Sequence, residues 1–281
     1  PAGAKQESFN TNFSNFMPNG SGVNLDSTNR TLNLIAAPGV LGGCFWSPTA
    51  IPLVGKIWRS YFEFKFTNAD KFALGASAND RGYGFTLQWV TSTSGSPPNT
   101  CGHESLMGAL GGSDPWGQHS ILIETDVHRD AAQHDPVENH TAVFTNGLID
   151  HAAPGNTLST TCDGSSTGCR HTPANLFEES GPHAHNQRVE IHTGCNASCS
   201  TCSPATHAPP NTFARISAWI DCQDCDQVTR DIDRVAQKPS LQRCINLDPS
   251  LATVYYGITG GFLSGANQQG VTVSNFFMRS E

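Results

Sequence analysis

The chain has 281 residues and a formal net charge of −8, with 24 acidic side chains against 16 basic ones. Nucleic-acid binding needs clustered Lys and Arg against phosphates, so this charge balance argues against DNA or RNA as a partner. No apolar run approaches the length of a membrane-spanning helix. Ten cysteines, and a start at Pro1 rather than Met that fits removal of an export signal, lead us to expect a secreted or cell-surface location.

Short apolar segments alternate with turns rich in Gly, Pro, Asn and Ser along most of the chain. We expect strands at residues 32–36, 58–66, 84–90, 121–127, 142–144, 188–192, 213–220 and 254–258. Many short strands without an amphipathic helical period predict an all-β protein, a two-sheet antiparallel jelly-roll sandwich. One β-domain of this length is ordinary, so we expect residues 1–281 to form a single domain.

Residues 145–210 differ from the rest because they are rich in Gly, Ser, Thr, Pro, His and Cys. Such a stretch buries little apolar surface, so we expect an insertion that cross-links must order. Eight of the ten cysteines lie within residues 162–244, with spacings such as Cys195-x3-Cys199-x2-Cys202. A disulfide framework and a zinc or iron–sulfur site both fit, and the even count favours disulfides. Cys44 and Cys101 are candidates to pair with each other, although spacing does not fix connectivity.

The densest group of metal-binding side chains falls in one stretch of seventeen residues. Glu124 and Asp126 are two apart on a predicted strand, so both point to one face. The polar loop that follows contains Asp130 and Asp135, and His140 begins the next strand. Carboxylate oxygens suit Ca²⁺, and an added imidazole suits a transition ion such as Mn²⁺. A solvated acidic loop is the alternative, and the fixed spacing favours the metal site.

This spacing resembles the metal loop of the L-type (legume-like) lectins, the concanavalin A-like family. That loop has Glu-x-Asp, a further ligand, an Asp-Pro pair and a His, and this chain matches every step. The resemblance implies a transition ion held by Glu124, Asp126, Asp135 and His140. It also implies a Ca²⁺ held by Asp126, Asp130, Asp135 and the backbone carbonyl of His128.

Other segments of the chain resemble the same family, except in about residues 150–210. Residues 82–88 resemble its Gly-x-Ala-Phe-x-Leu-Gln strand, and residues 255–261 and 271–276 resemble its penultimate and closing strands. The resemblance implies glycan contacts by four loops, through Asp80, Gly102, Asp130 and Gly265. Two positions depart from the family pattern: Asp130 replaces the usual Asn, and Arg81 occupies the place of the sugar-accepting Asp.

Three classes of function remain open at this stage. The resemblance implies a metal-dependent carbohydrate-binding protein, a lectin or adhesin module whose partners are glycans and which is not an enzyme. The departures at Arg81 and Asp130 favour an adhesion or structural module that lacks the sugar site. A glycoside hydrolase of the same architecture would use paired carboxylates such as Glu124 and Asp126. Its third acid is absent, because Arg129 occupies that position.

Overall fold

The computed structural model describes the strands of the protein and many of the loops between them. The described residues are 7–9, 16–20, 22–34, 42–66, 84–102, 107–128, 130–135, 139–159, 184–222, 225, 238–261 and 269–281. Within these ranges there is no helix long and apolar enough to cross a membrane. The helical segments described are short 3-10 turns, namely η5 (Ala131–Gln133), η7 (Pro204–Thr206) and η9 (Pro249–Ala252).

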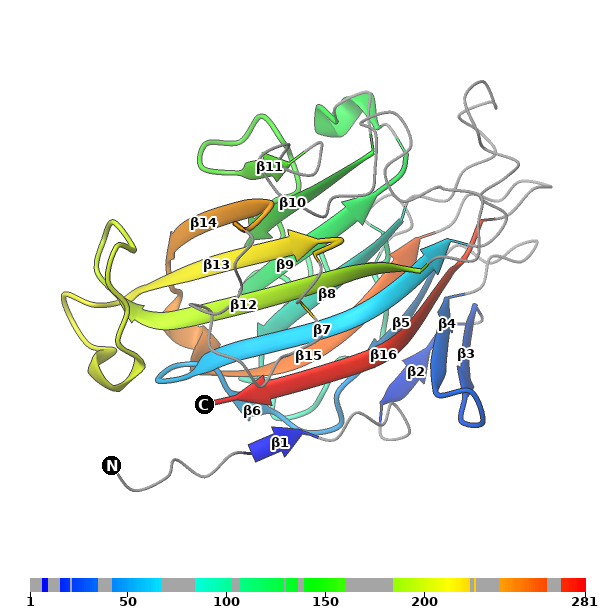
Figure 1. The fold of residues 1–281 in the computed structure, drawn as a ribbon, viewed down its shortest axis with the longest axis horizontal. Coiled ribbons are helices and arrows are strands. Elements are labelled where there is room, and N and C mark those ends of the chain that lie inside the picture. The colour runs from blue at the N-terminus through cyan, green and yellow to red at the C-terminus, as the bar shows by residue number, and fades with distance from the viewer. Residues whose placement is uncertain are drawn as a thin grey trace.

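Two antiparallel sheets of eight strands each lie face to face (Figure 1). The first sheet lies nearer the viewer in Figure 1 and has the order β14-β13-β12-β7-β16-β4-β3, with β1 beside β16. Its strands are β14 (Leu241–Asn246), β13 (Phe213–Ile220), β12 (His185–Cys195), β7 (Ile57–Phe66), β16 (Val271–Ser280), β4 (Thr31–Leu34), β3 (Val23–Asp26) and β1 (Glu7–Phe9).

The second sheet has the order β11-β10-β9-β8-β15-β5-β2, with β6 beside β15. Its strands are β11 (Thr157–Ser159), β10 (His140–Thr145), β9 (Ser120–Asp126), β8 (Gly84–Thr91), β15 (Thr253–Gly261), β5 (Gly42–Trp46), β2 (Met17–Asn19) and β6 (Ile51–Pro52). Strands β8 to β11 are consecutive in sequence, but β15 lies between β8 and β5, both of them far from it in the chain. The sheet therefore collects loops from distant parts of the chain at each of its two ends.

One hydrophobic core fills the space between the sheets. Alternate residues of β7 face inward, and their aromatic rings meet those of β8, with the ring centroids of Phe64 and Phe85 5.0 Å apart. Phe62 also packs edge to face on Phe85, with centroids 5.9 Å apart. Burying one such side chain stabilises the fold by about 1.5–3 kcal/mol. The inward-facing residues of the core are therefore the apolar half of the alternation that predicts strands from sequence.

The outer face of the second sheet is also covered. Leu122 of β9 points away from the main core and packs with Ala142 and Phe144 of β10, and with Ala109 and Ile149 from loops that fold over this face. All seven residues of β9 are buried as a result. This cover matters for the site, because the side chains next to Leu122 on the same face are shielded from solvent too.

The structure confirms the prediction of an all-β, two-sheet antiparallel sandwich with disulfides, and each predicted strand coincides with an observed one. The sequence pattern missed the short strands β1, β2, β3, β6 and β11, and also β5 and β14. Glycines open β5, and β14 alternates between buried Leu241 and exposed Gln242 at the edge of its sheet. The predicted insertion at about 145–210 contains β12, which pairs with β7 and β13 inside the first sheet. The segments outside the sheets are therefore shorter than that range.

Disulfides, not a thiolate metal site, occupy the described cysteines. The bridges are Cys44–Cys101, Cys195–Cys202, Cys199–Cys244 and Cys222–Cys225. The first confirms the pairing considered for Cys44 and Cys101. The close spacing of Cys195, Cys199 and Cys202 reflects two separate bridges, and no described cysteine is free. Cys162 and Cys169 lie outside the described residues.

Candidate metal centre

Strand β9 carries the first two acids of the site. Ile121 and Ile123 point into the main core, so Glu124 and Asp126 point to the opposite, outer face. The register with β10 sets Asp126 directly opposite His140. Glu124, Asp126 and His140 are 2%, 4% and 1% exposed, which leaves them without the solvent that normally stabilises charged groups.

The loop between β9 and β10 folds back and returns a third acid to this place. The carboxylate of Asp130 accepts a hydrogen bond of 2.9 Å from the backbone N–H of Ala132 and so caps η5. The backbone N–H of Asp130 donates to Asp135 Oδ2 at 2.6 Å, and that of His128 donates to Asp126 Oδ1 at 2.6 Å. As a result, the ligand atoms of Asp126, Asp135 and His140 lie within 4.8 Å of one another.

A residue that the sequence analysis missed, His151, completes the group. Its Nε2 lies 3.0 Å from Glu124 Oε1, 3.1 Å from Asp135 Oδ1 and 3.1 Å from His140 Nε2. The backbone N–H of His151 donates to the carbonyl of Gln133 at 3.0 Å, which ties this loop to η5. We call Glu124, Asp126, Asp135, His140 and His151 together the metal-centre cluster.

The sequence does contain a signal for His151. Asn146-Gly147 directly follows β10 and is a strong turn signal, and both residues adopt positive φ values of 59° and 66°. A tight turn at that point returns the chain over the face it has just left. The histidine four residues beyond Gly147 therefore lies above Phe144, with ring centroids 5.0 Å apart.

The metal-centre cluster brings three buried carboxylates close together, and their burial and charges shift the pKa values of Asp126 and His151. Burial raises the pKa of Asp126 well above its usual value near 3.8, and the charges of Glu124 and Asp135 raise it further. Burial by itself lowers the pKa of His151, but hydrogen bonds and charges from Asp135 and Glu124 outweigh it and raise the pKa to about 9. Among described residues, the ion pairs of Glu124 and Asp135 involve only histidines.

The donor set fits a divalent ion. Carboxylate oxygens and imidazole nitrogens are the groups that Ca²⁺ and transition ions take in proteins. Here they converge from two strands and two loops in a buried place that has an excess of negative charge. A bound cation would offset both the burial of the Asp126 carboxylate and its repulsion by Glu124 and Asp135, the two causes of its raised pKa.

Of the sequence-predicted metal ligands, Glu124, Asp126, Asp135 and His140 come together, and His128 and Asp130 lie beside them. The structure shows the amide of His128 bonded to Asp126 and one carboxylate oxygen of Asp130 engaged with Ala132. Of the predicted glycan contacts, Asp80 and Gly265 lie outside the described residues.

The strands that flank those two residues end beside the metal-centre cluster. Asp126 is in register with Gly84 at the start of β8. Gly84 is in turn in register with Gly261 at the end of β15, and Gly261 is in register with Gly42 of β5. Adjacent strands are about 4.8 Å apart, so this row crosses one end of the second sheet. Gly84 has φ +125°, and a Cβ there would lie 2.2 Å from the carbonyl oxygen of Thr125, so only glycine permits this approach.

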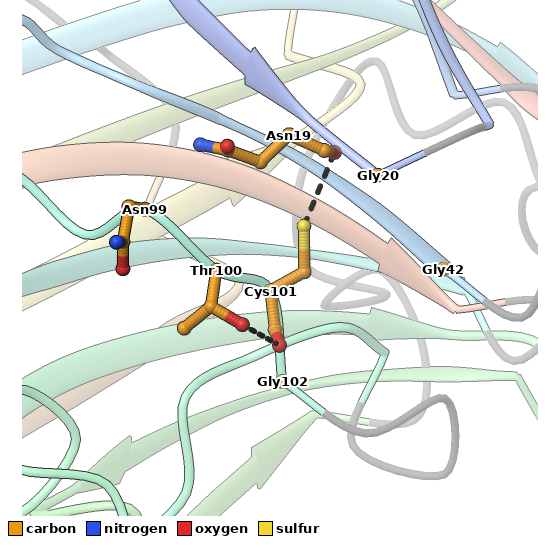
Figure 2. A pocket seen from close by; sticks show the side chains of 7 residues that line it. All are labelled: Asn19, Gly20, Gly42, Asn99, Thr100, Cys101 and Gly102. Atoms are coloured by element: carbon orange, nitrogen blue, oxygen red, sulfur yellow. Dashed lines mark hydrogen bonds between the residues drawn. The ribbon is translucent and has the colours of Figure 1, made fainter.

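Gly102 lies toward the other edge of the same sheet and lines a cavity of about 320 Å³ (Figure 2). The other lining residues are Asn19, Gly20, Gly42, Asn99, Thr100 and Cys101. The backbone N–H of Gly102 donates to the carbonyl of Gly108 at 2.7 Å. A Cβ at Gly102 would lie 1.5 Å from the carbonyl oxygen of Ala109. This glycine is therefore required by close packing, and its amide is already engaged within its own loop.

No protein-family model and no curated protein sequence matches this chain. Solved structures of legume lectins match it over nearly the whole length. A lectin from Bauhinia forficata in complex with GalNAc has a TM-score of 0.59 at 14% identity and covers 98% of both chains. Winged bean acidic lectin with methyl-α-D-galactose gives 0.58 at 12% identity over 99% of both. Lectin I-B4 from Griffonia simplicifolia, in a metal-free form, gives 0.56 at 11% over 99% and 100%.

These likenesses show that the chain has an L-type lectin-like fold, as the family resemblance of residues 124–140 implies. Identities of this size establish the architecture alone. The site must therefore be argued from its own residues.

Proposed function

We propose that the protein is a metal-dependent carbohydrate-binding protein, a lectin or adhesin module that binds glycans at the loops beside a Ca²⁺ site. The observation that carries this proposal is the burial of Glu124, Asp126, Asp135 and His140 together at one end of the second sheet. The strands that flank Asp80 and Gly265 end in the same row of residues. The described cysteines are in disulfides, which supports a secreted or cell-surface location.

The metals in this proposal have a structural role. Glu124, Asp126, Asp135 and His140 would hold a transition ion such as Mn²⁺, and Asp126, Asp130, Asp135 and the carbonyl of His128 would hold Ca²⁺. The bound ions would supply the positive counter-charge for these buried carboxylates. Residues 127–139 connect two strands and carry Asp130 and Asp135, so holding both acids fixes this loop. A loop ordered before the ligand arrives lowers the entropic cost of binding.

Glycan contacts would come from Asp80, Asp130, Gly265 and the loop that contains Gly102. An ionised carboxylate only accepts hydrogen bonds, so Asp80 and Asp130 would accept from sugar hydroxyls. Since the amide of Gly102 already donates to Gly108, the contacts from that loop would come from its other groups. Each polar contact nets only about 0.5–1.5 kcal/mol, so affinity for a simple sugar should be weak.

A glycan panel tests the proposal, with the protein first in saturating Ca²⁺ and Mn²⁺ and then in excess chelator. We expect binding that the chelator abolishes. Asp80→Ala should lose glycan binding and keep its metals, whereas Asp126→Ala should lose both. Failure to bind any glycan in saturating metal would contradict the proposed function.

A structural or adhesion module is the second candidate, and two observations favour it. The amide of Gly102 and one carboxylate oxygen of Asp130 are both engaged inside the protein. Such a module would keep its metal-dependent stability and bind no sugar. Metal-dependent melting together with an empty glycan panel would select this candidate.

The arrangement favours binding over hydrolysis. A retaining glycosidase needs two carboxyl groups that flank the scissile bond. Glu124 and Asp126 are almost fully buried, and Glu124 faces His140 and His151 at 3.0 Å instead of an open cleft. A reducing-sugar assay on glycans that bind is the direct test, and we expect no product.

A further inference from the structure

His151 adds a second imidazole to a ligand set that the family resemblance gives only one. We propose that His151 is a direct ligand of the transition ion, and that the centre is a two-imidazole site that prefers Zn²⁺, Co²⁺ or Ni²⁺ to Mn²⁺. This inference rests on the metal centre of the proposed function. It goes beyond that function by assigning a new ligand and a different class of ion.

The number of protons available at Nε2 supports this assignment. His140 Nε2 and His151 Nε2 both lie 3.0 Å from Glu124 Oε1, and they lie 3.1 Å from each other. His151 Nε2 also lies 3.1 Å from Asp135 Oδ1. Each Nε2 carries at most one proton, so two protons must serve four close contacts. If both nitrogens donate to Glu124, their N–H groups also crowd each other. A cation among the four atoms satisfies all the contacts at once.

The separations are those of neighbouring ligand atoms around one ion. Bonds from nitrogen or oxygen to a transition ion such as zinc are about 2.0–2.2 Å long. Two such bonds place their ligand atoms about 3.3–3.6 Å apart at the tetrahedral angle, and about 2.8–3.1 Å apart at the right angle of octahedral coordination. The distances of 3.0 Å and 3.1 Å among Glu124, Asp135, His140 and His151 fall in the octahedral range. The ligand atoms of Glu124, His140 and His151 all lie within 4.8 Å of one another.

Several contacts hold His151 in this position. Its side chain is 6% exposed, and its ring lies between those of Phe144 and His140, with centroids 5.0 Å and 4.7 Å away. Its backbone is fixed to Gln133, and Asp150 Oδ1 lies 2.8 Å from His134 Nδ1. Nδ1 of His151 is buried and has no hydrogen-bond partner among the described residues, so the ring makes its polar contacts through Nε2.

The second imidazole changes which ion the centre prefers. Imidazole suits Zn, Ni and Cu, whereas carboxylate, carbonyl and water suit Mg, Ca and Mn. A set with one imidazole among carboxylates is compatible with Mn²⁺, and a set with two moves toward Zn²⁺. The proposed Ca²⁺ ligands are oxygens of Asp126, Asp130, Asp135 and His128. Ca²⁺ binding should therefore not depend on His151.

The test uses the full chain, stripped of metal with chelator and then titrated separately with Zn²⁺, Co²⁺, Mn²⁺ and Ca²⁺. Sites of nitrogen and oxygen ligands generally bind Co²⁺ and Zn²⁺ more tightly than Mn²⁺, so the informative quantity is how much of the wild-type preference depends on His151. His151→Gln should weaken Zn²⁺ and Co²⁺ binding at least about tenfold and alter the visible spectrum of bound Co²⁺. It should change Ca²⁺ binding little. His119→Gln is the matched control. His119 lies just before the start of β9, is 42% exposed and pairs with Asp248, so it lies outside the metal-centre cluster.

The outcomes separate this inference from the proposed function. If no divalent ion binds to wild type, both fail. If Ca²⁺ and Mn²⁺ bind and His151→Gln leaves Zn²⁺ affinity and the Co²⁺ spectrum unchanged, only the two-imidazole site fails. A wild-type preference for Mn²⁺ also overturns it. If His151→Gln does not fold, X-ray absorption of the zinc-loaded wild type counts the imidazoles: two support the proposal and one overturns it.

Discussion

Each sheet carries one buried group of charged side chains on its outer face, and the two groups are balanced in opposite ways. On the first sheet, Arg59, Arg188, Glu190 and His192 form what we call the arginine cluster. Val189 and Ile191 of β12 point into the core, so the residues between them point outward. On the second sheet lies the metal-centre cluster. Both groups are shielded from solvent, and only the first contains arginine.

The arginine cluster is complete with the charges of the protein itself. Arg188 Nε donates to Glu190 Oε1 at 2.7 Å, and His192 Nε2 lies 2.9 Å from Glu190 Oε2. Arg59 Nη1 lies 3.0 Å from Glu281 Oε2. Burial raises the pKa of Glu190, but His192, Arg188 and Arg59 outweigh it and hold the pKa below its usual value.

In the metal-centre cluster the carboxyl pKa shifts in the opposite direction, upward. The buried carboxylates of this cluster face one another and two imidazoles, and the pKa of Asp126 is raised. Burial of charge occurs in both clusters, so burial alone does not indicate a site. The imbalance is the better indication, because buried carboxylates that lack a fixed counter-charge are neutralised either by protons or by a bound cation.

Removing the carboxylate of the arginine cluster should have the largest effect on stability. Glu190→Gln leaves Arg188 buried without its carboxylate partner and removes one of the two carboxylates near Arg59. Breaking such a buried pair costs about 3–5 kcal/mol. Urea unfolding at pH 7 measures the loss. Lys65→Gln is the control, since Lys65 is exposed on the same face of β7 and should change stability by less than about 0.5 kcal/mol. A loss below about 1 kcal/mol for Glu190→Gln would show that the cluster is not balanced as described.

Loading the metal-centre cluster should have the next largest effect. An ion that binds only the folded state stabilises it by about 2.7 kcal/mol when its concentration is 100 times its Kd. Chelator should therefore lower the melting temperature of wild type. Asp135→Ala should have the same low melting temperature with and without metal. Asp248→Asn, which changes an acid paired with His119, should keep the full metal-dependent increase. Equal melting of wild type with and without metal would exclude a structural ion.

The sequence predicts the part of the site that follows a strand register. Side chains on a strand alternate between its two faces, so Glu124 and Asp126, which are two residues apart, share a face. His140 follows from the return strand. The core strands were predictable for the same reason, because Phe62, Phe64 and Phe66 alternate with polar or exposed neighbours.

His151 was not predictable in the same way. Its contact with Glu124 depends on how a loop closes over a sheet face, through the turn at Asn146-Gly147 and the bond to Gln133. No periodicity encodes that closure. The arginine cluster was missed too, because Arg59 and Glu190 are 131 positions apart in the numbering and meet only through the pairing of β7 with β12.

Asp126→Asn should change stability in opposite directions in metal-free and in metal-saturated protein. In metal-free protein, Asp126 is buried beside Glu124 and Asp135, so removing its charge relieves repulsion. We expect Asp126→Asn to stabilise the metal-free protein by about 0.5–2 kcal/mol, as is common where a functional residue is held at a cost. In saturating metal the same variant should be less stable than wild type, because it lacks a ligand. Unfolding curves in chelator and in metal provide both values.

The two clusters should also respond to pH with opposite slopes in metal-free protein. The pKa of Glu190 is lowered in the folded state, so the stability it contributes is present above its unfolded value near 4.5 and is lost as pH falls through its folded pKa. The pKa of Asp126 is raised, so the folded state binds the extra proton, and stability falls as pH rises from about 3.8 toward the folded pKa.

Difference curves isolate each slope. The deficit of Glu190→Gln relative to wild type should shrink as pH falls below 4.5, because protonated Glu190 resembles Gln. The advantage of Asp126→Asn should grow as pH rises above about 4, because Asp126 then ionises in the unfolded wild type while the folded wild type holds this carboxyl protonated. These effects are smaller than the deletions, since protonation leaves the side chain in place. Parallel curves for the two variants would mean that the clusters do not differ in balance. Saturating metal should reverse the slope due to Asp126, because a bound cation holds its carboxylate ionised, and should leave the slope due to Glu190 unchanged.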